Sequence, residues 1–394
     1  MIWHIITGEY PPQPGGVSDY THEIARALAS EDDVVHVWNP SSSASVPSAR
    51  EIEIHNLPRG FGFRWLLELS RGLGRYPAPH NVVVQYVPHM YGWKSMNLAF
   101  CLWLVAQRNC HIIVMFHEVA YPFRAGQPRK HDLLAVVHRI MAWIVLRSAD
   151  FAFTSNGHYQ ALLHRLAPSD AQVGILRICS NIPFHSATNG AAQTGLMKPT
   201  HSHFTVGSFS SFGDEIREVL EPAVLCALRN PLIRIVLIGP ANSFVDSITA
   251  RFPEFADRIS TTGRVEAATA GPYLQDCDLL LQLYPDGACA ARGTLIAALA
   301  SGVPVVTTHG ALTDRLLLES GGLLFAENSP EDITAAIESL RSDVALRQRI
   351  GNRAKRLYEE NFHPKTIAVD LTRLVRVLTA VFLTHLQVSW LLGG

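Results

Sequence analysis

The chain has 394 residues, of which 48% are hydrophobic and 17% charged, against about 25% charged in an average soluble protein. This composition excludes a disordered protein and, at roughly 150 residues per domain, predicts two or three domains with large cores. The 33 basic and 34 acidic side chains leave a formal net charge of −1 without a basic block, which argues against a nucleic-acid partner held by its phosphates.

The first half of the chain alternates short apolar runs with longer helical patterns. Continuous β-branched runs of strand length are typical of parallel strands that are buried on both faces. The expected strands are 2–7, 82–87, 112–116 and 151–155, and the expected helices are 19–30, 95–108 and 130–148. Alternating strands and helices predict βαβ units and a doubly wound parallel sheet.

The second half repeats this rhythm. The expected strands are 204–208, 234–238, 279–283, 303–307 and 322–325. Gly302 is expected to close an Ala-rich helix, and Ser329 with Pro330 predicts the capped start of a later one. The sequence therefore predicts a second α/β domain.

The stretch 186–203 separates the two halves, because it is rich in Ser, Thr, Ala and Gly and has no apolar period. Such a composition predicts an interdomain linker. The expected organisation is an N-terminal domain over 1–185, a C-terminal domain over 204–365, and a helix over 366–394 that packs back toward the N-terminal domain. Facing α/β domains would leave a ligand cleft between the carboxyl ends of their sheets.

Three features bear on location. The first residues have no basic region or long apolar core of an export signal, and the apolar run 97–106 is too short to span a bilayer. The six cysteines form no CxxC pair and indicate reduced, mostly buried thiols. These features predict a cytoplasmic protein that is soluble or at most peripheral at a membrane.

The loop after the first strand, residues 8–20, is the first segment whose residues suit ligand binding. Gly15 and Gly16 would let the backbone approach a ligand closely, and the following helix would present free N–H groups. This pattern suits a phosphate or sugar-hydroxyl site, and an ordinary Gly-Pro connection is the alternative. It is neither a GxGxxG nor a Walker loop.

The second such segment covers residues 284–306, where a buried strand ends in a Pro-Asp-Gly turn and a small-residue loop leads into the Ala-rich helix. Arg292, Gly293 and Thr294 offer a guanidinium, bare N–H groups and a hydroxyl at the helix start. Together they suit a diphosphate. A surface ion pair of Arg292 is the alternative.

Several pieces of the chain match one family in order and spacing. They are PPQPGGVSDYT, MFHE, SNIP, LIGP, TGRV, ALASGVPVVTT and the tail SPEDITAAIESL…RQRIGNRAKRLYEENF. With these pieces the chain resembles, over nearly its whole length, the family-four retaining glycosyltransferases of GT-B fold, which transfer sugar from a nucleotide-sugar. The resemblance implies two Rossmann-like domains that face each other across a cleft, the first on the acceptor side and the second binding the donor.

The resemblance also implies roles for individual residues. His117, directly after the strand 112–116, would contact the transferred sugar as the catalytic residue, with a structural histidine as the alternative. Acceptor-side residues would be Asp19, Tyr20 and Glu118. Donor-binding residues would be Gly15, Gly16, Gly207, Ser208, Arg264, Val265, Arg292, Gly293, Thr294 and Leu295, with Arg264 and Val265 against the nucleobase. No cofactor and no metal ion are expected.

Two departures from the family pattern concern the catalytic centre. Where the family has two glutamates eight positions apart, this chain has Cys289 and Ala297, and the segment 207–214 replaces the family's Arg/Lys pair. These losses fit either a variant subgroup that uses Arg292 and Thr294 for the phosphates or a silent binding protein. An Arg292 that looks unpaired beside a Gly-rich loop favours the subgroup.

The expected function is a retaining, metal-independent glycosyltransferase in polysaccharide or glycoconjugate synthesis. UDP-glucose is the expected donor, and a saccharide or lipid-linked saccharide at the inner membrane face the expected acceptor. The leaving phosphate would take the acceptor proton, so that electrostatic stabilisation dominates. The alternatives are a catalytically silent nucleotide-sugar-binding subunit and an isomerase that uses Glu9 and Asp19.

Overall fold

The computed structural model of the chain describes residues 1–13, 15–30, 33–40, 51–58, 60–107, 109–168, 171–184 and 203–377. It divides into a first unit of Met1–Arg177 together with the chain from Pro364, and a second unit of Ile178–His363. The first unit thus ends before the predicted boundary at 185. The expected linker up to residue 202 and the final part of the expected C-terminal helix, 378–394, lie outside the described residues.

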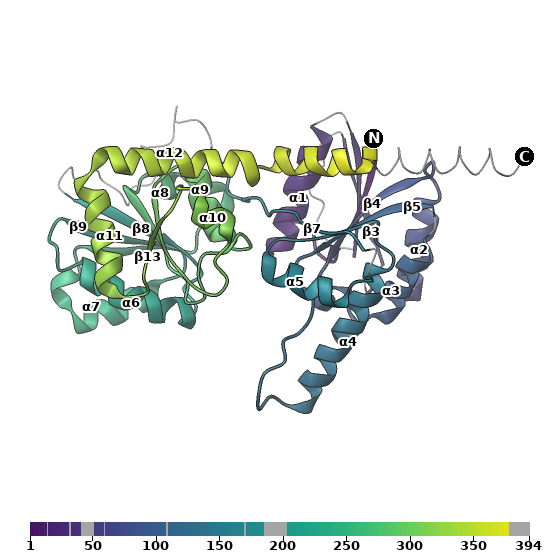
Figure 1. Ribbon diagram of the computed structural model, residues 1–394, viewed down its shortest axis with the longest axis horizontal. Helices are drawn as coiled ribbons and strands as arrows, with labels where there is room; N and C mark the ends of the chain where they lie inside the picture. Colours follow the sequence, from purple (N-terminus) through teal and green to yellow (C-terminus); the bar gives the residue numbers. More distant parts are fainter. Residues whose placement is uncertain are drawn as a thin grey trace, which may run out of the picture. The chain divides into compact units, whose positions relative to one another are not determined.

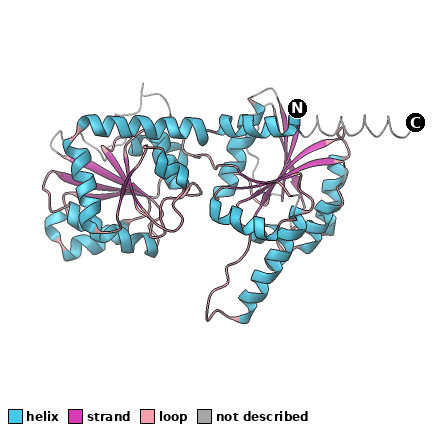
Figure 2. Ribbon diagram, viewed as in Figure 1, coloured by secondary structure: helices cyan, strands magenta, loops and turns pink. Residues whose placement is uncertain are grey.

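The described part of the first unit contains a parallel sheet in the order β3-β2-β1-β4-β5-β6-β7. Helices cover both faces of this sheet (Figure 1, Figure 2), and residues 364–377 are also helical. The strands are β1 Ile2–Ile6, β2 Val34–Pro40, β3 Ile52–Leu57, β4 His80–Tyr86, β5 Cys110–Phe116, β6 Phe151–Thr154 and β7 Val173–Ile175. The helices are α1 Gly16–Ala29, α2 Phe63–Leu73, α3 Leu98–Val105, α4 Arg129–Leu146 and α5 Gly157–Leu166, with 3₁₀ turns η1 Pro88–Tyr91 and η2 Trp93–Ser95.

The second unit repeats the architecture, with a parallel sheet in the order β10-β9-β8-β11-β12-β13 among its described residues. The strands are β8 Phe204–Phe209, β9 Ile233–Ile238, β10 Ile259–Gly263, β11 Leu279–Gln282, β12 Val305–Thr308 and β13 Leu324–Ala326. The helices are α6 Asp214–Ala227, α7 Asn242–Arg251, α8 Ala267–Gln275, α9 Gly293–Ser301, α10 Arg315–Glu319, α11 Pro330–Ser342 and α12 Val344–Asn361, with the 3₁₀ turn η3 Pro253–Phe255.

The helix signals of the sequence are confirmed at two termini. The Ser329 hydroxyl accepts a hydrogen bond from the Asp332 N–H at 3.1 Å, with Pro330 at the first helical position of α11. Gly302 ends α9 in the left-handed conformation, at φ +74. An L-side chain rarely adopts this conformation, so the glycine fixes the end of the helix.

The predicted α/β fold is confirmed, and each expected strand is present within a few residues. Continuous apolar runs do not predict β2, β3, β7 or β10. Three of these strands, β3, β7 and β10, lie at sheet edges. An edge strand has a neighbouring strand on one side only, so it is less buried and does not require a continuous apolar run.

In each sheet one pair of neighbouring strands marks the point where the strand order reverses. This pair is β1 and β4 in the first unit and β8 and β11 in the second. Open parallel sheets bind ligands outside the carboxyl ends of the strands at such a switch point. The loops that follow these four strands are therefore the expected positions of functional residues.

Candidate active site

The start of α9 is the first candidate site, in the second unit beyond the end of β11. Arg292 is the N-cap residue, no side chain caps the helix there, and its first turn contains no acidic residue. A Cβ atom added to Gly293 would meet nothing within 4 Å. The positive end of the helix dipole is thus open to an anion.

Leu295, although predicted as a donor-binding residue, has a different environment. Its side chain is completely buried in the core of the second unit. Its N–H donates to the Arg292 carbonyl at 3.0 Å. Leu295 therefore anchors α9 to the sheet, whereas Gly293 is exposed and Thr294 is partly exposed.

Arg292 is not unpaired, which corrects the expectation from the sequence. Its guanidinium forms an ion pair with Asp286, which lies in the Pro-Asp-Gly turn after β11. It also lies over the ring of Tyr284, 4.3 Å from the centroid. Since a guanidinium has five N–H donors and this side chain is 27% exposed, Arg292 can still bind an anion while Asp286 and Tyr284 orient it.

Tyr284 connects Arg292 to Thr294. Its hydroxyl lies 3.0 Å from Thr294 Oγ1 and 3.1 Å from the side-chain amide of Gln282. Its backbone N–H donates to Thr308 Oγ1 at 3.0 Å. Burial raises the pKa of Tyr284 to about 12, so the phenol is neutral and serves as a fixed support for Arg292.

Gly207 and Ser208 lie within β8, as the predicted strand 204–208 requires. A Cβ atom at Gly207 would lie 2.4 Å from Cys277 Sγ, and Ser208 is 4% exposed. Close packing inside the sheet therefore explains the glycine. The loop at the switch point begins only after Phe209.

The loop after β8 packs tightly against the loop after β9. A Cβ atom at Gly239 would lie 2.1 Å from the Ser210 carbonyl oxygen, and the φ of Gly239 is +134. Gly239 also forms an isolated bridge with Gly263 at the end of β10. This arrangement places the three segments side by side at the carboxyl edge of the second sheet.

Arg264 and Val265 follow Gly263 directly. Arg264 is exposed, whereas Val265 packs against the cluster of apolar residues around α9. A contact of this turn with a nucleobase stays a prediction.

The two positions at which the family has glutamates are closed to solvent. Cys289 is 5% exposed and Ala297 is completely buried. Burial raises the pKa of the Cys289 thiol to about 11, so it is neutral and cannot replace a carboxylate. Asp314, which the sequence analysis did not single out, accepts a hydrogen bond from the Ala290 N–H and thereby holds this loop.

The start of α1 in the first unit differs from the expectation of free N–H groups. The Glu9 carboxylate accepts a hydrogen bond from the Ser18 N–H at 3.1 Å. A Cβ atom at Gly15 would lie 2.4 Å from Glu9 Oε1. The place predicted for a donor phosphate is thus taken by a carboxylate of the protein, while a Cβ atom at Gly16 would meet nothing within 4 Å.

His117 lies at the end of β5, as expected, and has two defined neighbours. Its Nε2 is 2.7 Å from Gln85 Oε1, and its ring meets that of Tyr20 edge-on with 5.1 Å between centroids. Burial lowers the pKa of His117 to about 3, so the imidazole is neutral. With Nε2–H donating to Gln85, Nδ1 keeps a lone pair that can accept a hydrogen bond from a sugar hydroxyl.

The other acceptor-side candidates lie near the same edge of the first sheet. Asp19 is in the first turn of α1, and the Glu118 carboxylate is 3.3 Å from Nδ1 of His89 in η1. The structure brings His117 together with Tyr20. Gln85 and His89 were missed, although Gln85 near the end of β4 and His89 in the following turn η1 both lie beside the switch point, which is the signal for them.

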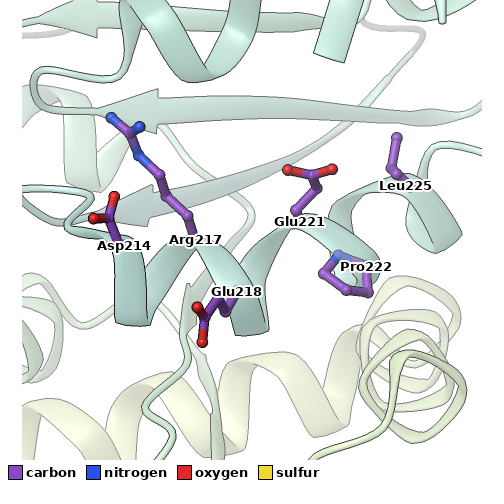
Figure 3. Close-up of a pocket in the computed structure, with 6 residues that line it drawn as sticks. All are labelled: Asp214, Arg217, Glu218, Glu221, Pro222 and Leu225. Atoms are coloured by element: carbon purple, nitrogen blue, oxygen red, sulfur yellow. The ribbon is translucent and has the colours of Figure 1, made fainter. Parts of the chain in front are cut away.

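A surface pocket of about 480 Å³ lies along α6 in the second unit, and none of the predicted residues lines it (Figure 3). Its lining consists of Asp214, Arg217, Glu218, Glu221, Pro222 and Leu225. Three carboxylates and one guanidinium make it unfavourable for a diphosphate. The start of α9 is therefore the better candidate for a diphosphate site.

Residues 203–343 match the family model of glycosyl transferases group 1, so the resemblance expected from the sequence is confirmed over that segment. Among curated proteins, none matches the chain.

Solved structures share the fold over nearly the whole chain. Sucrose-phosphate synthase from Thermosynechococcus elongatus has a TM-score of 0.69 and 17% identity, over 96% of this chain and 99% of the other. Anabaena HepE in complex with UDP and glucose has a TM-score of 0.67 and 15% identity, over 96% and 100%. WaaG, a glycosyltransferase involved in lipopolysaccharide biosynthesis, has a TM-score of 0.60 and 13% identity, over 94% and 99%. The chain has the GT-B fold of these enzymes.

Proposed function

We propose that the protein is a glycosyltransferase that uses a nucleoside-diphosphate sugar and binds the diphosphate at the start of α9. The observation that carries the proposal is the uncapped N-terminus of α9 with Arg292 at the N-cap and no acidic residue in the first turn. It lies at the switch point of the unit that matches the glycosyltransferase family model. The diphosphate is the charged part of the donor that such a helix start favours.

Departure of the nucleoside diphosphate leaves negative charge on its terminal phosphate. The dipole of α9, the Arg292 guanidinium and the Thr294 hydroxyl stabilise this charge more in the transition state than in the ground state. The phosphate oxygen accepts the proton of the attacking hydroxyl, which approaches from the same face of the sugar. The reaction retains configuration and needs neither the family's glutamates nor a metal ion.

In this proposal the first unit contacts sugar hydroxyls. Nδ1 of His117 accepts a hydrogen bond from the transferred sugar, and Tyr20 fixes the imidazole ring from its edge. Asp19 and Glu118 bind the acceptor. Neutral imidazole suits this role, because it selects a hydroxyl without attracting the diphosphate.

UDP-glucose is the proposed donor, and it is supported by the fold shared with HepE, which has been observed with UDP and glucose. The test is to incubate the protein with a panel of nucleotide-sugars and to measure free nucleoside diphosphate. A transferase slowly hydrolyses one donor, and Arg292→Ala should lower kcat/KM for that release about 100-fold. Binding without release would indicate a silent subunit, and conversion of the sugar without release would indicate an isomerase.

The proposed acceptor is a lipid-linked saccharide, because an exposed apolar stripe on α4 suits a membrane surface. Spacing by three and four residues puts the stripe on one face of the helix, and each of its members is at least 43% exposed: Leu133, Val136, Ile140 and Trp143. Figure 1 shows α4 extending away from the sheet of the first unit. Within the described residues no helix is long and apolar enough to cross a bilayer.

Basic residues at both ends of the stripe favour an anionic lipid surface. Arg129 and Lys130 lie in the first turn of α4, and Arg147 follows its last residue. A basic side chain near an anionic membrane contributes about 1 kcal/mol. An apolar stripe flanked in this way is typical of helices that lie in the membrane interface.

Sedimentation with vesicles tests the membrane contact. We expect binding to vesicles of phosphatidylglycerol and phosphatidylcholine, and the double variant Ile140→Ser/Trp143→Ser should reduce the bound fraction about tenfold. Leu232→Ser removes an apolar side chain of similar exposure from the second unit and serves as the matched control. Equal binding of all three proteins would contradict the assignment.

A further inference from the structure

Three side chains with metal-ligating atoms meet where β2 pairs with β3, away from the carboxyl edge of the first sheet. His36 pairs directly with Glu53, and Trp38 pairs with His55. Glu53 and His55 are two residues apart on β3 and so point to the same side. Strand register alone therefore brings His36, Glu53 and His55 to one surface of the sheet.

The ligand atoms are separated by the distances that a bound ion requires. His36 Nδ1 is 3.1 Å from His55 Nε2 and 3.2 Å from Glu53 Oε2, and His55 Nε2 is 3.8 Å from Glu53 Oε1. Around tetrahedral zinc, with Zn–N of about 2.0–2.1 Å, neighbouring ligand atoms lie about 3.3–3.4 Å apart. The three atoms need to move little to coordinate one ion.

Aromatic neighbours fix both imidazole rings. The His55 ring stacks on Trp38 with 3.9 Å between centroids and 12° between planes. The His36 ring stacks on His4 at 5.1 Å and packs against Tyr76 at 4.2 Å. Rings that are held in place before an ion arrives lose little conformational entropy on binding it.

The cluster is also accessible from solvent. The side chain of Glu53 is 61% exposed, whereas that of His36 is 4% exposed. An ion can therefore enter past the carboxylate and reach the buried imidazole.

We propose that His36, Glu53 and His55 bind a divalent transition-metal ion, Zn²⁺ by preference, with water as the fourth ligand. Two imidazoles and a carboxylate form a donor set that zinc accepts. The ion joins the edge strand β3 to β2 and stabilises the fold of the first unit. It has no part in sugar transfer, so this site is independent of the proposed function.

The competing arrangement is a hydrogen bond between the two imidazoles. One of the two nitrogens 3.1 Å apart must then carry a proton, and a bound ion would replace that proton. Calorimetry separates the two arrangements when ZnCl₂ is titrated into the metal-stripped full-length protein. The comparison proteins are Glu53→Gln, His55→Gln and the control His164→Gln, which changes an exposed histidine on α5.

We expect one tight Zn²⁺ per chain in the wild type and the control, and at least tenfold weaker binding in the other two variants. Zn²⁺ should also raise the Tm of the wild type and the control only. Since Glu53 is exposed, Glu53→Gln should keep the metal-free Tm. Visible absorption of Co²⁺ in place of Zn²⁺ reports four-coordination.

The same Zn²⁺ affinity in all four proteins, or no stoichiometric binding by the wild type, would overturn the proposal. Release of nucleoside diphosphate, measured with and without a chelator, distinguishes the metal-site proposal from the proposed glycosyltransferase function. A chelator should lower the Tm and leave the release per folded protein unchanged. Failure of donor hydrolysis would leave the metal titration fully interpretable.

Discussion

The starts of α1 and α9 have the same local design and opposite charge. Each follows a loop with glycine at the carboxyl edge of a parallel sheet, beside a switch point. At α1 the Glu9 carboxylate accepts from the Ser18 N–H, and Asp19 lies in the first turn. At α9 the N-cap is Arg292, and the first turn has no acidic residue.

Glycine at a helix start therefore does not by itself identify a phosphate site. The dipole of either helix favours an anion, but at α1 the protein supplies that anion itself. Charge in and around the first turn decides whether a phosphate can bind. This contrast is why we propose α9 for the donor diphosphate and neutral groups such as His117 and Gln85 for sugar hydroxyls.

The strongest test of this comparison removes the charge at α9. We expect Arg292→Ala to lower kcat/KM for the donor about 100-fold, which corresponds to about 2.7 kcal/mol of transition-state stabilisation. The loss should exceed that of a single charge-assisted hydrogen bond, because Asp286 would face the diphosphate without its partner. Steady-state release of nucleoside diphosphate measures it.

Two control variants show whether the loss of activity is specific to Arg292. Arg315→Ala removes an exposed arginine paired with Glu319 in the same unit and should leave kcat/KM within twofold of the wild type, as expected for a surface ion pair worth about 0–1 kcal/mol. Asp286→Asn in the Arg292→Ala background should recover part of the loss, because it removes the unpaired carboxylate. An unchanged UDP affinity of folded Arg292→Ala would contradict the α9 assignment.

The buried, neutral imidazole of His117 predicts that the stability of the protein depends on pH. Burial holds the pKa of His117 at about 3 instead of 6.5, so between these pH values the unfolded chain binds a proton that the folded chain does not. Stability therefore falls as the pH decreases below 6.5. At pH 5, which is 1.5 units lower, this amounts to about 2 kcal/mol at 1.36 kcal/mol per unit.

Replacement of His117 isolates its contribution. His117→Gln should lose less Tm between pH 7.5 and pH 5 than the wild type, while UDP affinity stays nearly unchanged and sugar transfer falls. A change at His164, which is exposed on α5, should leave the pH dependence unaltered. The same decrease of Tm with pH in wild type and His117→Gln would contradict the buried neutral imidazole.

Much of the fold was predictable from strands that are buried on both faces. The central strands β5 and β11 contain continuous apolar runs, and the sequence predicts their ends within two residues. β3, with the sequence IEIHNL, instead alternates apolar and polar residues, as a strand with only one buried face does. Continuous apolar runs therefore do not predict it. For this reason His36, Glu53 and His55 could not be brought together from the sequence.

The site was predictable in position and less so in detail. His117 and Arg292 follow from strand ends and a helix start, which are local signals. The carboxylate partners Glu9 and Asp286 could not be assigned, because contacts such as Glu9 with Ser18 and Asp286 with Arg292 depend on how each loop turns. Sequence patterns predicted the elements that carry the candidate residues, and the paired charges distinguish the two helix starts.

The smallest expected effect distinguishes two neighbouring glycines at α1. Gly15→Ala should cost about 1 kcal/mol of stability, since its Cβ would lie 2.4 Å from Glu9 Oε1 and displace a carboxylate that acts as a helix cap. The φ of Gly15, 169°, is extended and adds no strain. Gly16→Ala should be neutral or slightly stabilising, because nothing lies within 4 Å of its Cβ and alanine favours the helix.

Chemical denaturation of the two single variants and of Glu9→Gln measures these differences. If Gly15 acts through Glu9, the double variant Gly15→Ala/Glu9→Gln should lose little more than either single change. Gly16→Val should abolish transfer at native stability only if the loop contacts the donor sugar. Additive losses at Gly15 and Glu9 would show that the carboxylate does not cap α1, and the contrast with α9 would then no longer rest on an internal anion.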